Sequence, residues 1–198
     1  HDSSFPVNSI NYCLGEAFIS PKELDAVVFY DNPMLTFDRV VKNFLMTAPR
    51  GLEQWQKACK SLLGSKFNIK ERLRRALGTD FKLLFTDHHM SHAASAFYPS
   101  PFKDAAIIIA DGVGEWATTS LGFGKDQRIE IFKEIDYPHS LGLLYTAFTT
   151  YCGFKANSGE YKLMGLAPYG RPKFADKIRE NLVDIKADGS LRLNMKYF

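Results

Sequence analysis

The segment "DAAIIIADGVGEWATTSLGFG", Asp104 to Gly124, carries the clearest indication of the fold. Its apolar runs flank a glycine-containing connection, a pattern typical of two strands joined by a turn. The next run, "RIEIFKEI" from Arg128 to Ile135, alternates apolar and polar residues with the period of two that marks a half-buried strand. The sequence therefore predicts a three-stranded meander over residues 104–135.

Helices and further strands are predicted on both sides of this meander. Apolar runs at 26–30 and 81–86 predict strands, the first of them buried, while helical spacing covers 6–18, 36–77 (three helices), 140–154 and 159–170. In "SPKE", Ser20 and Glu23 have the spacing of a capping box. Strands mixed with helices in this order predict an α/β fold rather than an all-α one.

Composition excludes several classes of protein. Of 198 residues, 45% are apolar and 24% charged, as in a folded domain, and a net charge of +3 gives no support for nucleic-acid binding. Three distant cysteines outside any CxxC pattern argue against a disulfide framework and for a reducing, cytoplasmic compartment. We expect no signal peptide and no membrane helix, which needs about 20 apolar residues. The start "HDSSFP" and the strand-like end lead us to expect an excised fragment.

Three of the five histidines lie in "TDHHMSHAASAFYPSP", Thr86 to Pro101. If a helix begins here, His88 and His92 are four residues apart on one face, where two imidazole nitrogens can bind one cation. His89 and His92, three apart, form a rival pair. Spacing alone supports a surface or core histidine pair equally well.

A third ligand must come from another segment, and Asp111 is the candidate. It follows a very hydrophobic strand and precedes Gly112 and Gly114, whose amides can approach an anion closely because no Cβ intervenes. A carboxylate beside bare backbone suits a cation together with phosphate oxygens. A tight Asp-Gly hairpin turn explains the same residues locally and is favoured when they are considered alone.

A second candidate anion site lies in "KANSGEYKL", where Ser158 and Gly159 precede a helix that carries Glu160 and Lys162 in its first turn. Free amides at a helix start bind phosphate, and Glu160 could accept hydrogen bonds from two ribose hydroxyls. The alternative is an ordinary capped helix with a favourable N-terminal Glu. His139 precedes an apolar helix, and we predict a capping or core role for it.

Four stretches taken together resemble the carbamoyltransferase family, which includes a nodulation protein that carbamoylates chitin oligosaccharides and enzymes that carbamoylate antibiotics. They are "HDSSFPVNSINYCL", "DHHMSHAASAFYPSPF", "DGVGEWATTSLGFG" and "PHSLGLLYTAFTTYCGFKANSGEYKLMGLAPYG". The resemblance covers nearly the whole chain and is strongest from Phe85 to Gly170. The span from Pro33 to Gly78 contributes little to it.

The resemblance implies an incomplete actin/hexokinase-like (ASKHA) fold, with a mixed sheet and flanking helices. Residues 1–198 would be part of the N-terminal module, with the opening strands and the second lobe outside it. In the family, a C-terminal YrdC-like domain of the same chain makes carbamoyl adenylate from ATP and carbamoyl phosphate. The N-terminal module then transfers the carbamoyl group to a hydroxyl of a small molecule or sugar.

The resemblance also implies residue roles. His88 and His92 match the family's metal-binding pair and Asp111 a third ligand, with iron(II) as the metal, while a fourth ligand far downstream has no counterpart. We further predict a nucleotide site, with phosphate and ribose held at the turn and helix start described above and with Glu160 near the ribose. Its residues are Gly112, Gly114, Ser158, Gly159, Glu160 and Lys162. No general base can be assigned.

Two rival functions are kept. An ATP-dependent kinase or hydrolase of the same superfold would turn over ATP without carbamoyl phosphate and would not need His88 and His92. A non-catalytic nucleotide-binding module would tolerate the loss of both histidines. We expect the fragment to be inactive alone.

Overall fold

A computed structural model describes residues 4–198, and the chain divides into two compact units, His1–His88 and His89–Phe198. The first three residues of the motif "HDSSFPVNSINYCL" lie outside the described part. The predicted α/β class is confirmed. In place of the predicted mixed sheet, the described strands form three small sheets of two, three and two strands, the first parallel and the other two antiparallel.

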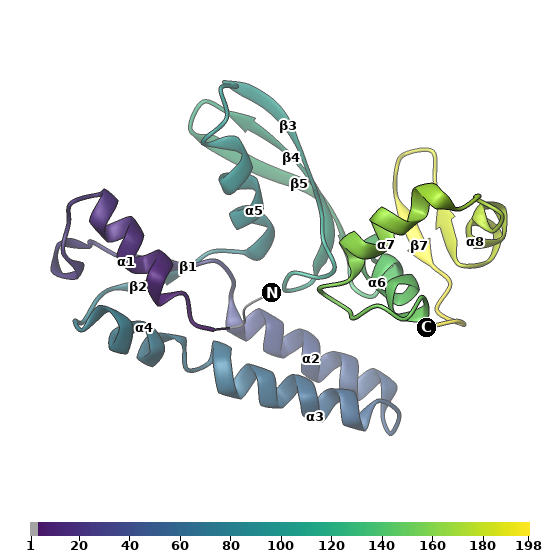
Figure 1. The fold of residues 1–198 in the computed structure, drawn as a ribbon, viewed down its shortest axis with the longest axis horizontal. Coiled ribbons are helices and arrows are strands. Elements are labelled where there is room, and N and C mark those ends of the chain that lie inside the picture. The colour runs from purple at the N-terminus through teal and green to yellow at the C-terminus, as the bar shows by residue number, and fades with distance from the viewer. Residues whose placement is uncertain (1–3) are drawn as a thin grey trace. The chain divides into compact units, whose positions relative to one another are not determined.

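The first unit is mainly helical (Figure 1). Its elements are α1 (Val7–Glu16), the 3₁₀ turn η1 (Pro21–Glu23), β1 (Val27–Phe29), α2 (Pro33–Thr47), α3 (Leu52–Ser61), the π-helical turn η2 (Leu62–Lys66), α4 (Ile69–Leu77) and β2 (Leu83–Phe85). Figure 1 shows α2 and α3 side by side, joined by a short loop. The three predicted helices are confirmed, although Gly64 lies within the π-helical turn and does not end a helix.

Local signals explain several of these boundaries. The predicted capping box is present, because the backbone N–H and Oγ of Ser20 both donate to Glu23 Oε2 at 2.8 Å.

Strands β1 and β2 pair in parallel, with Val27 opposite Leu83. The predicted burial of β1 is wrong, since Val28 is 59% exposed.

A buried ion pair joins two distant parts of the first unit. Asp31, which follows β1 and is 2% exposed, pairs with Lys66 at the end of the π-helical turn. Thr36 in the first turn of α2 is also buried, with its Oγ1 3.5 Å from Lys66 Nζ. A carboxylate buried this deeply requires a cationic partner, so the pair fixes the turn against the start of α2.

The second unit contains the predicted meander, which is confirmed. Its elements are α5 (His88–Phe97, whose first residue belongs to the first unit), β3 (Asp104–Ala110), β4 (Ala117–Lys125), β5 (Arg128–Asp136), α6 (Leu141–Tyr151), α7 (Glu160–Leu166), η3 (Ala167–Tyr169), α8 (Ala175–Asn181), β6 (Val183–Ile185) and β7 (Leu191–Leu193). Strands β3, β4 and β5 form one antiparallel sheet in sequence order.

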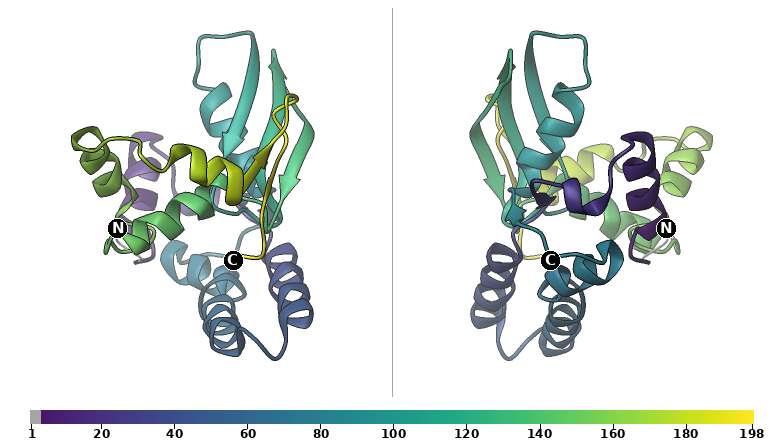
Figure 2. Two further views of the ribbon diagram at one scale, coloured as in Figure 1. Left: turned by 90° about the vertical axis from the view of Figure 1, so that its right-hand side faces the viewer. Right: turned by 90° about the vertical axis from the view of Figure 1, so that its left-hand side faces the viewer.

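Helix α5 packs on one face of this sheet, as Figures 1 and 2 show. The apolar contact is made by Ala93 and Phe97 of the helix with Ile107 and Ile109 of β3, while Ile108 points the other way and is 74% exposed. The Phe97 ring lies over Gly124 of β4, where an added Cβ would be 2.7 Å from ring carbons. The glycine therefore permits the close approach of the helix to the sheet.

A second apolar cluster holds the C-terminal part together. Leu144 of α6 packs with Val183, Leu191 and Leu193 of the β6–β7 hairpin. This cluster packs α6 against the β6–β7 hairpin. Within residues 4–198, no helix is long and apolar enough to cross a membrane.

Candidate metal centre

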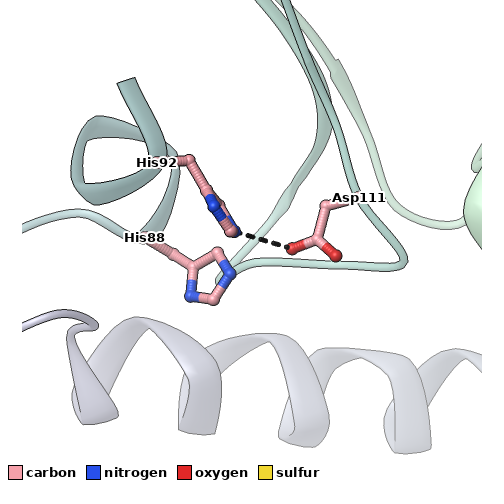
Figure 3. Close-up of side chains that lie close together, drawn as sticks. All are labelled: His88, His92 and Asp111. Atoms are coloured by element: carbon pink, nitrogen blue, oxygen red, sulfur yellow. Dashed lines mark ion pairs between the residues drawn. The ribbon is translucent and has the colours of Figure 1, made fainter. Parts of the chain in front are cut away.

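Three of the predicted site residues come together in the structure. Ligand atoms of His88, His92 and Asp111 all lie within 4.8 Å of one another, and Figure 3 shows the three side chains converging. His88 and His92 occupy successive turns of the continuous helix α5, and Asp111 follows the last residue of β3. The relative placement of the two imidazoles is therefore set by one helix, whichever unit His88 is assigned to.

The distances and donor types fit a divalent transition metal. An ion bound at about 2.0–2.2 Å from each ligand atom requires those atoms to lie no more than about 4.4 Å apart. His92 Nε2 and Asp111 Oδ2 are 3.7 Å apart, within that limit, and the three ligand atoms together lie within 4.8 Å of one another. The His92 side chain is 50% exposed and that of Asp111 30%, so an ion can reach them from solvent. Two imidazoles and one carboxylate suit several divalent ions.

His89 has a different role from its neighbours. It is 3% exposed, and its Nδ1 lies 2.6 Å from Oγ of Ser120, a fully buried residue of β4. Ser120 Oγ donates in turn to Glu134 Oε1 at 3.1 Å, so Nδ1 of His89 must carry the proton that it donates to Ser120. This hydrogen bond fixes the rotation of α5 about its own axis on the sheet. With His89 turned toward the sheet, His88 and His92 lie on another face of the helix. The sequence placed His89 off the metal face but contained no sign of its anchor.

The tight Asp-Gly hairpin turn considered for Asp111 is wrong. Strands β3 and β4 are joined by the longer segment 111–116, and neither Gly112 nor Gly114 has positive φ. Gly112 N donates to Asp111 Oδ1 at 2.6 Å, and Gly114 N donates to the Ala117 carbonyl at 2.9 Å. Both amides that were predicted to bind phosphate thus have protein acceptors in this structure. We call residues 111–116 the Asp111 loop.

The start of α6 is fastened to the backbone of the Asp111 loop. Ser140 is fully buried, and its hydroxyl lies within donating distance of the carbonyl oxygens of Asp111 (3.1 Å) and Gly112 (2.7 Å). The same oxygen caps the helix by accepting from Leu143 N. Two residues on, an added Cβ at Gly142 would lie only 2.4 Å from the Asp111 carbonyl oxygen. Sequence reasoning missed these contacts, because only the N-cap has a local signal.

In the second predicted anion-binding segment, the Glu160 carboxylate accepts hydrogen bonds from backbone amides of the segment itself. Glu160 Oε1 accepts from Asn157 N (2.9 Å) and Thr146 Oγ1 (3.0 Å), and its Oε2 accepts from Gly159 N (3.1 Å). The backbone donation from Asn157, followed by further hydrogen bonds, lowers the pKa of Glu160 below its ordinary value. Gly159 is required by packing, since an added Cβ would lie 2.6 Å from the Lys155 carbonyl oxygen.

Helix α6 connects both candidate segments. Ser140 at its N-cap contacts the Asp111 loop, and Thr146 contacts Glu160. At 1.5 Å per residue, these two points of attachment are about 9 Å apart along the helix axis. Ser158 is half-buried in the same stretch, and Lys162 is exposed on α7. His139 has the predicted structural role, since its Nδ1 accepts from Leu193 N at 3.2 Å.

A two-histidine, one-carboxylate centre on an α/β unit is the class of site that the geometry defines. The family model "Carbamoyltransferase N-terminus" matches residues 1–198, and the chain belongs to this family.

Similar proteins agree with that assignment. The uncharacterized protein sll1178 of Synechocystis is 57% identical over 100% of this chain and 34% of its own length. The nodulation protein NolNO of Sinorhizobium fredii is 29% identical over 98% of this chain and 27% of its own length. The nodulation protein NolO of Bradyrhizobium diazoefficiens is 31% identical over 55% of this chain. The chain spans about a third or less of the length of these relatives.

Proposed function

We propose that this chain is the metal-binding part of an O-carbamoyltransferase. In the whole protein, a carbamoyl group would pass from carbamoyl adenylate, made from carbamoyl phosphate and ATP, to a hydroxyl of a small-molecule or sugar acceptor. Family membership supports the reaction class. The observation that carries the proposal is the convergence of His88, His92 and Asp111, because that donor set suits a divalent cation.

His88, His92 and Asp111 would hold the ion, here proposed to be iron(II) or another divalent metal. When bound, it would supply positive charge that stabilises the negative charge developing on the departing phosphate oxygen. The chain's own residues define where that phosphate can lie. Gly112 places its backbone amide next to the Asp111 carboxylate, and the phosphate would bind there and at Gly114 only after both amides release the acceptors they have in this structure.

Glu160, Ser158, Gly159 and Lys162 form the proposed ribose end of the same site. The attachment of α6 to both segments, about 9 Å apart along its axis, supports a ligand that extends from the Asp111 loop to Glu160. Nucleotide binding would require the Gly112 amide to exchange Asp111 Oδ1 for phosphate. It would likewise require Glu160 to exchange local backbone donors for ribose hydroxyls.

Metal content provides the first test. The chain, purified without a chelator or a His-tag, is expected to carry near-stoichiometric iron, zinc or manganese by elemental mass spectrometry. The H88A/H92A double variant should lose it. The matched control is His139→Ala, which removes an imidazole whose Nδ1 accepts a hydrogen bond from Leu193 N of β7. Equal metal content in the double variant and the wild type would refute the assignment.

Activity in the whole protein separates the proposal from its rivals. His92→Ala is expected to abolish carbamoyl transfer while carbamoyl adenylate still forms, because the two steps belong to different domains in this proposal. A kinase or hydrolase would consume ATP without carbamoyl phosphate. Transfer at the wild-type rate in the variant would refute the metal assignment.

A further inference from the structure

We infer that Ser140 and Gly142 are positioning residues that hold Asp111 in place for metal binding, an inference that rests on the proposed function. The Ser140 hydroxyl contacts backbone carbonyls, and Gly142 contributes by having no Cβ. Both act on the peptide backbone that carries the Asp111 carboxylate, from a helix that begins about thirty residues later in the chain.

The backbone of Asp111 is held on both sides. Its N–H donates to the Thr118 carbonyl of β4 at 2.9 Å. The one proton of the Ser140 hydroxyl is shared between two carbonyl oxygens of the loop, that of Gly112 at 2.7 Å and that of Asp111 at 3.1 Å. Ser140 and Thr118 are both fully buried, so water cannot replace these bonds. The peptide planes at Asp111 therefore have one preferred orientation.

Thr118 extends the connection to the segment before α6. Its side-chain hydroxyl lies 2.9 Å from the Ile135 carbonyl and 2.6 Å from the His139 carbonyl, while its backbone carbonyl accepts from Asp111. Thr118 of β4 is thus hydrogen-bonded both to Asp111 and to the segment that leads into α6. Movement of the α6 start would be transmitted to Asp111 from both sides.

Gly142 provides the steric part of the arrangement. An added Cβ would lie 2.4 Å from the Asp111 carbonyl oxygen, 2.7 Å from its carbonyl carbon and 2.8 Å from Gly112 N. All three are backbone atoms, so no side-chain rotation can relieve the contact. Any larger residue must displace either the first turn of α6 or the Asp111 loop.

The Asp111 carboxylate is carried by this restrained backbone. Its side chain is 30% exposed, Oδ1 accepts from N of the next residue, Gly112, and Oδ2 lies 3.7 Å from His92 Nε2. A shift of the Asp111 peptide would therefore move the carboxylate relative to His88 and His92. Because the histidines are fixed separately through α5 and Ser120, loss of the α6 contacts should alter one ligand and leave two in place.

The test is titration of the whole 198-residue chain with Zn²⁺ and Co²⁺, for which water can complete the coordination by three protein ligands. Loss of an outer contact to a metal ligand typically weakens metal affinity about 10–100-fold. We expect about 10-fold weaker binding for Ser140→Ala and a loss toward the upper end of that range for Gly142→Ala. Ser140→Thr, which keeps the hydroxyl, should recover most of the affinity.

Matched controls separate positioning from general loss of stability. Asn32→Ala removes another helix N-cap, the side chain that accepts from Met34 N in the first unit. Gly165→Ala adds a methyl group to helix α7 at a position with nothing within 4 Å of the new Cβ. Both controls should bind Zn²⁺ within about 2-fold of the wild type, since they leave Ser140, Gly142 and their contacts with the Asp111 loop unchanged.

The visible spectrum of bound Co²⁺ supplies a readout that altered stability does not move. The Ser140→Ala and Gly142→Ala spectra should shift toward that of Asp111→Asn, because the same ligand is displaced. Wild-type affinity and spectrum in both variants would overturn this inference and leave the metal site standing. If Ser140→Ala does not fold, Gly142→Ala and Ser140→Thr decide the question. Failure of the wild type to bind either ion would overturn both proposals.

Discussion

Replacing Ser120 with alanine tests whether the His89 hydrogen bond fixes α5 on the sheet. The variant removes the acceptor 2.6 Å from His89 Nδ1, and the two residues are 0% and 3% exposed. A buried donor left without its partner costs about 1–3 kcal/mol. Glu134, the other partner of Ser120, is exposed and can be hydrated, so its loss adds little. We expect a decrease of about 2 kcal/mol in the free energy of unfolding.

Urea unfolding followed by tryptophan fluorescence can measure this change within one unit. The chain has two tryptophans, Trp55 in the first unit and Trp116 in the second. In a Trp55→Phe background, the signal reports only the unit that contains the His89–Ser120 pair. A lower urea midpoint with an unchanged slope is the expected result, because a change in stability alone leaves the exposed surface constant.

Two comparisons show whether the hydrogen bond is responsible. Ser95→Ala removes an exposed hydroxyl from the same helix, one that donates to the His92 carbonyl, and should change stability by less than about 0.5 kcal/mol. In a double-mutant cycle, His89→Ala and Ser120→Ala should couple by more than about 0.5 kcal/mol. A Ser120→Ala variant as stable as the wild type, or additive effects in the cycle, would refute the anchoring argument.

Three further changes test other parts of the structure. Gly124→Ala should destabilise the second unit by about 1–3 kcal/mol in the same urea assay, because the new methyl group meets the Phe97 ring; wild-type stability would contradict the close packing of α5 on β4. Glu160→Gln should lower the melting temperature at neutral pH, because a carboxyl with a lowered pKa stabilises the fold while it is ionised in the native state. The difference from the wild type should shrink as the pH falls below about 4.5, where the wild-type carboxyl becomes protonated. A constant difference across pH would contradict that role. Lys66→Met should lower the free energy of unfolding of the first unit by about 3 kcal/mol, followed through Trp55 fluorescence, because the Asp31 carboxylate stays buried without its cation. Adding Asp31→Asn to the same chain should restore stability.

The sequence was most informative where one short segment determines the structure. The meander over residues 104–135 and the histidine helix each have a local hydrophobic period, and the Ser20–Glu23 capping box is a contact between near neighbours. Asp111 was grouped with His88 and His92 by the family resemblance, because the residues considered alone favoured a turn; the structure brings the three side chains together. Family resemblance added the expected reaction class, which a motif of this length cannot establish alone.

Features that depend on distant residues could not be predicted in this way. The Asp-Gly pair favoured a tight turn, but hydrogen bonds to Asp111 Oδ1 and Ala117 produced a longer loop. The apolar run of β1 suggested burial, although its short parallel pairing with β2 leaves Val28 exposed. The contacts of Ser140 with the Asp111 loop join residues about thirty positions apart, where hydrophobic periodicity carries no information.

The parallel pairing of β1 with β2 sets the order in which the first unit can fold. The residues between the strands, 30–82, include helices α2, α3 and α4. Closing a connection of this length costs chain entropy before the strand pair makes its few hydrogen bonds, whereas helical contacts form between near neighbours. The strand pair should therefore close last during folding and open first under native conditions. The amide proton of Val27, which donates to the Lys82 carbonyl at 2.8 Å, should exchange with solvent through this opening.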